Sequence, residues 1–365
     1  MMLTLRIWLR HQLLPFKKKS HINNMNLNRR NFLISGLASA ACLNVEAGTS
    51  VPSSTLRFCA FADIHYYPGV FPHDTRAWLE RILARAEQTK CDMVIHMGDF
   101  CHTPQSCRDY ADFYNDFHIK TYHTIGNHDD DGNEHERTLE AYRLTCGHYY
   151  FDRGGFRFIV TDTNNFFVEG KWSHYSKSNY YKVAKAVKKS ISRVPPEQLE
   201  WLKEVIDQSP YPCIVTSHAS YERAVGGSPD GVQIRQIFNA ANAKNPGRVR
   251  LVINGHHHQD NVRILDNIVY FDMNSANYDW IDKVHSAYPE EYKTKWRLAH
   301  HTLMWDDPLS AIIEIGTDGT LKVDGTRSTF HLGVTPQVAG IRAYDDCGRT
   351  TSPIIQSFAL KMRYC

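Results

Sequence analysis

Five short motifs carry side chains that could bind metal ions. They are Asp63-Ile64-His65, Gly98-Asp99, Gly126-Asn127-His128-Asp129, the single His218 and Gly255-His256-His257-His258. Asp63, Asp99 and Asn127 offer hard oxygen donors, and His65, His218, His256 and His258 offer imidazole nitrogens. This mixture suits Mn, Fe, Zn or Co and does not suit calcium. In Asp-x-His and His-x-His, alternate side chains point to the same side of an extended segment.

The number of donors indicates more than one ion. Seven ligands exceed one tetrahedral site and match two metal ions that share a bridging carboxylate. Two metal ions about 3.5–4 Å apart are the usual arrangement for in-line displacement at phosphorus.

Each motif directly follows a segment with the character of a buried strand. These predicted strands cover residues 56–62, 93–97, 122–125, 214–217 and 249–253. Loops at the carboxyl ends of strands converge on the ligand site of an open α/β sheet, so we expect one shared pocket. Further strands are predicted over 156–161, 268–272, 311–315 and 321–323, the last after a hairpin turn at Asp318-Gly319.

Helical spacing of apolar residues predicts helices over 75–88, 108–117, 136–142 and 196–207, the last with Pro195-Pro196 at its first turn. Strand–helix alternation in the first half and a more β-rich second half favour a layered α/β sandwich.

The five motifs, complete and in this order, resemble the DxH, GD, GNH(D/E), H and GHxH series of calcineurin-like metallophosphoesterases. The resemblance extends from about Leu56 to Val323. Asp129 and the segment Glu197-Gln198-Leu199-Glu200-Trp201-Leu202 resemble the bacterial branch that includes class III cyclic-nucleotide phosphodiesterases. The resemblance implies a four-layer αββα sandwich, in which two central β-sheets are flanked by helices.

The resemblance also implies a role for each motif residue. One metal ion would be held by Asp63, His65 and His258, the other by Asn127, His218 and His256, with Asp99 bridging them. A metal-bridging hydroxide would attack phosphorus in line. His128 would bind no metal and would protonate the leaving-group oxygen as a general acid, oriented by Asp129 or Asp63.

One position departs from a related pattern. Purple acid phosphatases, in the same superfamily, have a metal-bound tyrosine three residues after the bridging aspartate, where this chain has His102, and a DxG first motif. A tyrosinate–iron colour is therefore not expected. His102 either approaches the first metal ion or the substrate, or lies on the surface.

Two segments leave alternatives open. Residues 163–194 form an insertion with seven basic side chains and one acidic one, which is either a lid that attracts phosphate or a solvated helical insertion. Residues 226–231 form a flexible loop that could border the substrate. The tail over 326–365 has no assigned role, although 354–360 could form a final strand.

The N-terminal 47 residues have the character of a targeting segment. Arg29-Arg30 precedes a short apolar run over 34–43, a pattern typical of a twin-arginine export signal. Met25 is a candidate start and cleavage could follow Ala47. Cys42 is an alternative lipid-attachment site. Export predicts a periplasmic or cell-envelope location.

Composition narrows the function classes. The chain has 365 residues, 42% hydrophobic and 22% charged, which excludes disorder, collagen and coiled coil. The net charge is +3, but residues 1–47 carry +6 and the remainder −3, so no nucleic-acid surface is expected. Past residue 50 no apolar run is long enough to span a membrane.

The nine cysteines show no CxxC pair, which argues against a zinc knuckle, and Cys101–Cys107 and Cys347–Cys365 are candidate disulfides.

The sequence thus predicts an exported dimetal hydrolase of phosphate mono- or diesters, including cyclic nucleotides as a substrate alternative. A non-catalytic binding module on the same fold and a storage or structural metal protein are the alternatives.

Overall fold

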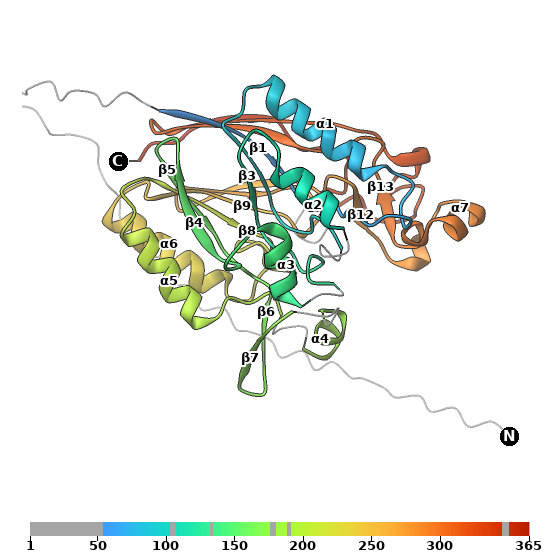
Figure 1. Cartoon of the computed structure of the whole chain (residues 1–365), viewed down its shortest axis with the longest axis horizontal. Coiled ribbons are helices and arrows are strands. Elements are labelled where there is room, and N and C mark those ends of the chain that lie inside the picture. The colour runs from blue at the N-terminus through green and yellow to red at the C-terminus, as the bar shows by residue number, and fades with distance from the viewer. Residues whose placement is uncertain are drawn as a thin grey trace, which may run out of the picture. The chain divides into compact units, whose positions relative to one another are not determined.

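The computed structural model describes residues 54–102, 107–131, 134–175, 180–187, 191–344 and 350–364. The expected export signal, with Cys42, lies outside the described residues, and so do Cys347 and Cys365. Figure 1 shows the arrangement of the elements.

Two six-stranded sheets form the centre of the structure. The first has the order β16-β15-β14-β1-β2-β3 and the second the order β10-β11-β9-β8-β5-β4. The strands of the first sheet are β1 (Thr55–Phe61), β2 (Met93–His96), β3 (Thr121–His123), β14 (Ala311–Gly316), β15 (Thr320–Gly325) and β16 (Phe358–Lys361). Those of the second are β4 (Tyr149–Arg153), β5 (Phe156–Val160), β8 (Cys213–Ser217), β9 (Val249–Asn254), β10 (Asn261–Leu265) and β11 (Ile268–Asp272).

Two small hairpins and the helices complete the described residues. The hairpins pair β6 (Asn165–Val168) with β7 (Lys171–His174) and β12 (Tyr278–Trp280) with β13 (Thr302–Met304). The α-helices are α1 (Thr75–Gln88), α2 (Arg108–Asn115), α3 (His135–Tyr142), α4 (Tyr180–Val187), α5 (Pro196–Asp207), α6 (Gly231–Lys244) and α7 (Glu290–Lys295). Short 3₁₀ turns cover Lys283–His285, Arg297–His300 and His331–Gly333.

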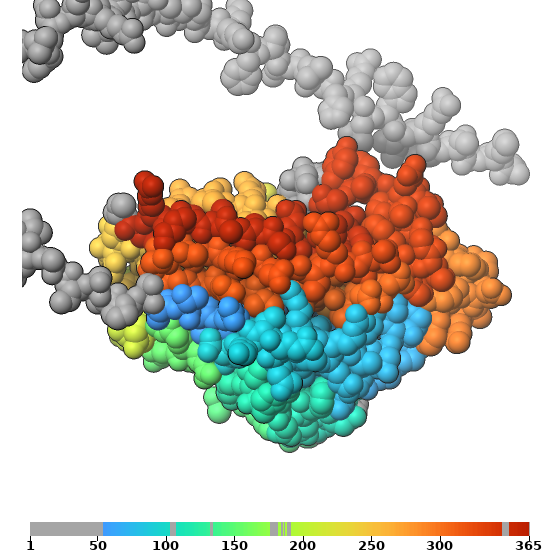
Figure 2. All heavy atoms as spheres, turned by 90° about the horizontal axis from the view of Figure 1, so that it is seen from above, coloured from blue at the N-terminus to red at the C-terminus, as the bar shows by residue number. Residues whose placement is uncertain are grey.

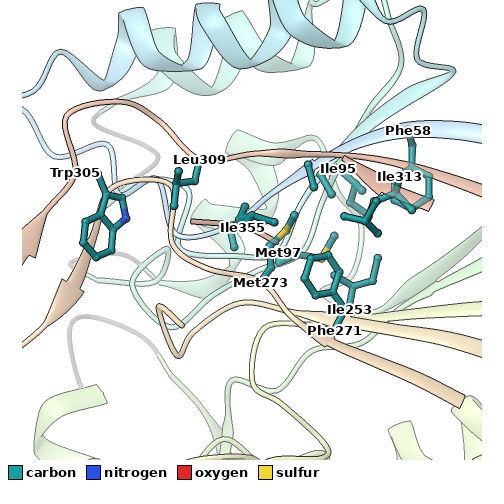
Figure 3. Close-up of a cluster of buried hydrophobic side chains, with 14 of the residues drawn as sticks. Phe58, Ile95, Met97, Ile253, Phe271, Met273, Trp305, Leu309, Ile313 and Ile355 are labelled. Carbon is teal, nitrogen blue, oxygen red and sulfur yellow. The ribbon is translucent and has the colours of Figure 1, made fainter. Parts of the chain in front are cut away.

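The alternation of side chains along β1 shows how the layers stack. Phe58 and Ala60 lie in the core between the two sheets, together with Phe158 and Ile253 (Figure 3). Cys59 and Phe61 point to the other face, where α1, α2 and α3 cover the first sheet. A third cluster joins the outer face of the second sheet to α5 and α6. The fold is therefore the expected four-layer αββα sandwich.

Helix α1 illustrates why the sequence forms these elements. The Asp74 carboxylate caps its N-terminus by accepting hydrogen bonds from the Arg76 and Ala77 amides, both at 3.1 Å. Trp78, Ile82 and Ala86 recur at helical spacing and are buried against the first sheet.

The topology brings the motif loops together. Strands β1, β2 and β3 are parallel, with Phe61 beside His96 and His96 beside His123. In the second sheet, β8 and β9 are also parallel and end level, with Ser217 beside Asn254. All five motifs therefore leave the carboxyl ends of strands at one edge of the sandwich.

Several elements were not expected from the sequence. Helix α6 follows directly after the glycine-rich loop over 226–231, and strands β4 and β10 extend the second sheet at its edges. The insertion was expected to be helical if it was not a lid. Its described part contains helix α4 and, before it, the β6–β7 hairpin, so the insertion is helical only in part.

The C-terminal residues complete the first sheet. Strand β16 pairs antiparallel with β15 and begins at Phe358, four residues after the expected start at 354. Ile355 is buried in the core between the sheets. Figure 2 shows the red C-terminal residues lying against the orange segment of the chain.

The structure also bears on one candidate disulfide and on the expectation that no segment spans a membrane. Cys101 and Cys107 are not joined in a disulfide, so this candidate pair is wrong. Among the helices that the structure describes, none has the length and apolarity needed to cross a membrane.

Candidate metal centre

The backbone of the motif loops adopts an unusual conformation. Five predicted metal ligands have positive φ angles, namely Asp63 at 50°, His65 at 49°, Asp99 at 50°, His256 at 73° and His258 at 54°. Such residues cost about 1–3 kcal/mol each and persist only where the surrounding structure holds them. The repetition at five ligand positions indicates that the loops are shaped for a site.

Glycine is required where the loops meet. Gly98 has φ 92°, and a Cβ atom there would collide with the His218 ring. A Cβ atom at Gly255 would lie 2.5 Å from Asp63 Oδ2. The glycines of two motifs therefore let the backbone approach the side chains of other motifs.

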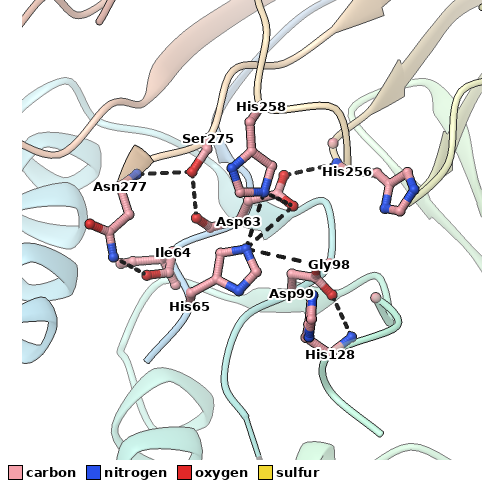
Figure 4. Close-up of polar contacts among 12 residues, drawn as sticks. Asp63, Ile64, His65, Gly98, Asp99, His128, His256, His258, Ser275 and Asn277 are labelled. Carbon is pink, nitrogen blue, oxygen red and sulfur yellow. Dashed lines mark hydrogen bonds and ion pairs between the residues drawn. The ribbon is translucent and has the colours of Figure 1, made fainter. Parts of the chain in front are cut away.

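The first cluster consists of Asp63, His65 and His258. The Nε2 atom of His258 lies 3.3 Å from Asp63 Oδ1 and 3.2 Å from His65 Nε2 (Figure 4). His258 Nδ1 donates a hydrogen bond to the Tyr278 carbonyl oxygen at 2.5 Å. Because this bond fixes the proton on Nδ1, the Nε2 lone pair points toward the other two side chains.

The second cluster consists of Asp99, His218 and His256. His218 Nε2 lies 3.2 Å from both Asp99 Oδ2 and His256 Nδ1. His218 Nδ1 donates to the Met97 carbonyl oxygen at 2.7 Å, which again directs Nε2 into the cluster. Asn127, the fourth predicted ligand here, is buried and lines the same cavity as Asp99 and His256.

Asp99 lies between the two clusters. Its Oδ2 atom is 3.2 Å from His218 Nε2 and 3.8 Å from His65 Nε2. Its Oδ1 atom accepts a hydrogen bond from the His128 amide at 2.8 Å (Figure 4). One carboxylate thus faces both clusters, as a bridging ligand must.

Two buried oxygens test whether this site fits metal ions. Asp63 Oδ1 and Asn127 Oδ1 are buried and accept no hydrogen bond. An unsatisfied buried oxygen costs about 1–3 kcal/mol. Each belongs to a predicted ligand, one in each half of the site, so coordination to a cation would satisfy both atoms. The residues therefore fit two metal ions.

The electrostatics favour a cation as well. Burial lowers the pKa of His65 and His256, which leaves these imidazoles neutral and able to coordinate. Burial acts in the same direction on His218, but the adjacent Asp99 outweighs it and raises the pKa of His218 to about 9. The pKa of Asp99 is held well below its usual value because His218 and His128 outweigh the effect of burial.

The partner of His128 differs from both predictions. His128 Nδ1 lies 2.6 Å from Asp131 Oδ2. Burial lowers the pKa of His128, but the Asp99 and Asp131 carboxylates outweigh it, so the net shift is upward. Asp131 is therefore the carboxylate that orients His128, and the expectation of Asp129 or Asp63 in this role is corrected.

Asp129 instead holds two motif loops together. Its Oδ1 atom accepts hydrogen bonds from the Phe100 and Cys101 amides, at 2.9 and 3.0 Å, and from the Tyr142 hydroxyl at 2.6 Å. Its Oδ2 atom accepts from the Gly126 amide at 2.8 Å. Both oxygens of Asp129 thus accept hydrogen bonds from backbone amides, one of them also from the Tyr142 hydroxyl, whereas His128 Nδ1 pairs with Asp131.

A known domain family matches this chain. The model of the calcineurin-like phosphoesterase family matches residues 56–260, which is more than half of the chain. The chain belongs to this family. The protein is accordingly a metal-dependent phosphoester hydrolase. No curated protein matches the chain.

A solved structure supports the fold of the phosphoesterase. A dimetal phosphatase from Danio rerio is similar with a TM-score of 0.54 at 13% identity, over 84% of this chain and 99% of that one. A purple acid phosphatase from yellow lupin (Lupinus luteus) has a TM-score of 0.45 at 14% identity, over 75% of this chain and 52% of that one. At 13% identity, the similarity to the Danio rerio phosphatase shows the fold alone.

His102 of the phosphoesterase lies inside the site and not on the surface. It is buried, its Nε2 atom is 3.1 Å from His65 Nδ1, and its ring stacks on Tyr67. His102 Nδ1 lies 3.4 Å from Asp131 Oδ2. Asp131 therefore contacts both histidines, and sequence reasoning missed it because only its three-residue spacing from His128 could have indicated the contact.

A cavity of about 600 Å³ in the phosphoesterase opens onto the second cluster and onto Asp99, the carboxylate that lies between the two clusters. Its lining consists of Asp99, Asn127, His128, His256, Trp280, Ile281, Arg297, Leu298 and His301. A second cavity, also of about 600 Å³, touches His256 from the side of Arg223 and the loop over 226–231. That loop therefore lines a cavity together with His256, and its contact with the substrate stays a prediction. His257 lines only the second cavity and is not placed in either cluster.

Proposed function

We propose that this protein hydrolyses phosphate mono- or diesters outside the cytoplasm, with two metal ions held by the seven motif residues. The observation that carries the proposal is the pair of clusters joined by Asp99, with buried Asp63 Oδ1 and Asn127 Oδ1 atoms that accept no hydrogen bond. The chemistry of the donors supports Mn, Fe, Zn or Co.

The roles of the residues follow from their positions. Asp63, His65 and His258 would hold one ion, Asn127, His218 and His256 the other, with Asp99 shared. When bound, two such ions supply a nucleophile from water and neutralise charge on the phosphate. His128 lines the cavity beside Asp99 and pairs with Asp131, which supports the proposal that it donates a proton to the leaving oxygen.

The cavity supports a substrate larger than inorganic phosphate. Arg297 offers a cation for a phosphate oxygen, and Trp280 offers an aromatic face against which an organic leaving group could pack. A cyclic nucleotide is one such substrate. The bacterial class III phosphodiesterase branch remains a prediction from the sequence.

The decisive experiment combines turnover with metal content. We expect reconstituted protein to hydrolyse p-nitrophenyl phosphate or its bis-ester, to lose activity with EDTA and to regain it with Mn²⁺. His128→Ala should reduce turnover by about 10²–10⁴-fold at unchanged metal content. Unchanged turnover in His128→Ala would refute the role of His128, and the absence of EDTA-sensitive turnover would favour the binding or storage alternatives.

The substrate is tested by a panel of monoesters, diesters and cyclic nucleotides at equal metal loading. A kcat/KM at least tenfold higher for one of these three groups than for the others would identify the substrate class. The export proposal is tested separately, by fusing residues 1–47 to a reporter and replacing Arg29-Arg30 by Lys-Lys, which should keep the reporter in the cytoplasm.

A further inference from the structure

A second group of metal-binding side chains lies outside the two clusters. It consists of Asp130, His135 and His174, with Asp162 beside them. They come from four separate segments: the loop that follows the Asn127-His128 motif, the first residue of α3, the last residue of β7 and the loop after β5. Such convergence of unrelated segments is typical of a built site.

The two imidazoles face one carboxylate through the same ring atom. Asp130 Oδ2 lies 3.3 Å from His135 Nδ1 and 3.5 Å from His174 Nδ1. The ring centroids are 3.7 Å apart with planes inclined by 33°. Ligand atoms around a tetrahedral zinc ion lie roughly 3.4 Å apart, because each is about 2.0–2.2 Å from the metal.

The opposite edges of the rings face a second carboxylate. Asp162 Oδ2 lies 2.8 Å from His174 Nε2 and 4.0 Å from His135 Nε2. Histidines that bind metals commonly donate their other ring N–H to a carboxylate, which orients the ring and strengthens the ligand. Asp162 is in the position of that outer carboxylate.

Asp130 provides an independent indication of a ligand. Its residue is 1% exposed, and its Oδ1 atom is buried without a hydrogen-bond partner. Two carboxylates against two imidazoles also leave excess negative charge at this place unless cations balance it. A divalent ion bound by neutral imidazoles would balance both carboxylates and satisfy the unpaired oxygen.

We propose that Asp130, His135 and His174 bind a third divalent metal ion, of which Zn²⁺ fits the donors best, through the Asp130 carboxylate and the two Nδ1 atoms. The donor set is two imidazoles and one carboxylate, a set that zinc accepts with water in the fourth position. This ion would be separate from the dimetal centre and would not take part in hydrolysis.

The alternative to a bound metal ion is a protonated His174 at the same place. His174 Nδ1 donates to the Tyr175 carbonyl oxygen at 2.6 Å. Burial opposes protonation, but Asp162 outweighs it and raises the pKa of His174 to about 9. A protonated His174 between two carboxylates therefore competes with the metal ion, and the metal would have to displace the Nδ1 proton.

The proposed ion would tie three parts of the fold together. His174 belongs to the β6–β7 hairpin of the insertion, and His135 begins α3. Asp130 is the chain neighbour of Asp131, which orients His128. The ion would therefore fix the insertion and the start of α3 to the loop that supports the candidate general acid.

The test is the number of zinc ions bound by full-length protein that is stripped, reloaded with Zn²⁺ and desalted. We expect three ions per chain in the wild type and two in His135→Ala/His174→Ala. The matched control is His118→Ala, because His118 is exposed on the surface, and it should retain three ions. Asp63→Asn should lose metal from the dimetal centre only, which separates failure of this proposal from failure of the proposed function.

A second readout is the stabilisation by zinc. Zn²⁺ should raise the Tm of Asp63→Asn, and adding His135→Ala/His174→Ala to that variant should reduce the rise. If the double histidine variant does not fold, the isosteric Asp130→Asn variant is used in its place. This variant is also expected to bind two zinc ions per chain. Equal zinc content in the wild type and the folded variant would overturn the proposal in favour of the protonated histidine.

Discussion

Replacing Asp131 by Asn should impair hydrolysis through His128. Asp131 Oδ2 lies 2.6 Å from His128 Nδ1, and the Asp131 side chain is 14% exposed. The substitution retains an oxygen that can accept the hydrogen bond but removes its charge. The orientation of His128 should survive, while its protonated form loses stabilisation.

The magnitude follows from the strength of this contact. Hydrogen bonds to charged groups contribute about 1.5–3 kcal/mol, against about 0.5–1.5 kcal/mol for neutral ones. A loss of roughly 1–1.5 kcal/mol in the transition state lowers kcat about tenfold. Because Asp131 helps to raise the pKa of His128, the variant should also have a lower His128 pKa.

The assay compares two leaving groups across pH. An alkyl phosphate needs a proton on its departing oxygen, whereas p-nitrophenolate leaves with little assistance, so the fall in kcat should be larger for the alkyl ester. If His128 is the general acid that we propose, activity needs its protonated form and should be lost as pH rises through its pKa. The alkaline limb of the profile should therefore move to lower pH in Asp131→Asn.

Asp116→Asn is the matched control, because Asp116 is 65% exposed and pairs with Arg143 on the surface. In a His128→Ala background, Asp131→Asn should cause little further loss, since both changes remove one function. An equal fall on both esters with an unmoved alkaline limb would refute the assignment of Asp131.

Two further predictions concern the backbone and the buried histidines. Gly98→Ala should lower metal content and reduce activity more than tenfold, because a Cβ atom at φ 92° would collide with His218, as measured by metal analysis and turnover. Burial lowers the pKa of His123 to about 3 and of His73 to about 4, against about 6.5 in the unfolded chain. The unfolded state therefore binds more protons below pH 6.5, and stability should fall by roughly 1 kcal/mol per pH unit for each group between pH 6 and 4, measured by urea unfolding in EDTA.

Each of these predictions has its own control. Gly69→Ala places an alanine at φ 82° with no neighbour within 4 Å. This variant should have the same kind of backbone strain as Gly98→Ala but should retain its bound metal and its activity. Equal losses of metal and activity in Gly98→Ala and Gly69→Ala would contradict the explanation that a Cβ atom at Gly98 collides with His218. His123→Gln should flatten the acid dependence of stability, whereas a slope equal to that of the exposed His118→Ala would contradict the role of His123.

The sequence determined the fold class and predicted which side chains meet at the candidate site. Buried strands followed at once by Gly, Asp, Asn or His predict that polar side chains meet at the carboxyl ends of a sheet, and the structure places Asp63, Asp99 and His256 there. Elements with clear apolar periodicity, such as α1 and α5, were also predicted with their observed bounds. Helix α6 was not, because the glycine-rich loop before it was interpreted only as flexible, although Asp230 at its N-cap position is a residue type favoured at helix starts.

Only the tertiary structure assigned the three consecutive aspartates, because identical side chains in one turn leave it in different directions. Asp129 accepts backbone hydrogen bonds from two motif loops, Asp130 faces His135 and His174, and Asp131 holds His128. The sequence gives each the same chemistry, and the roles differ only because segments distant in the chain, including α3 and the insertion hairpin, pack around this turn.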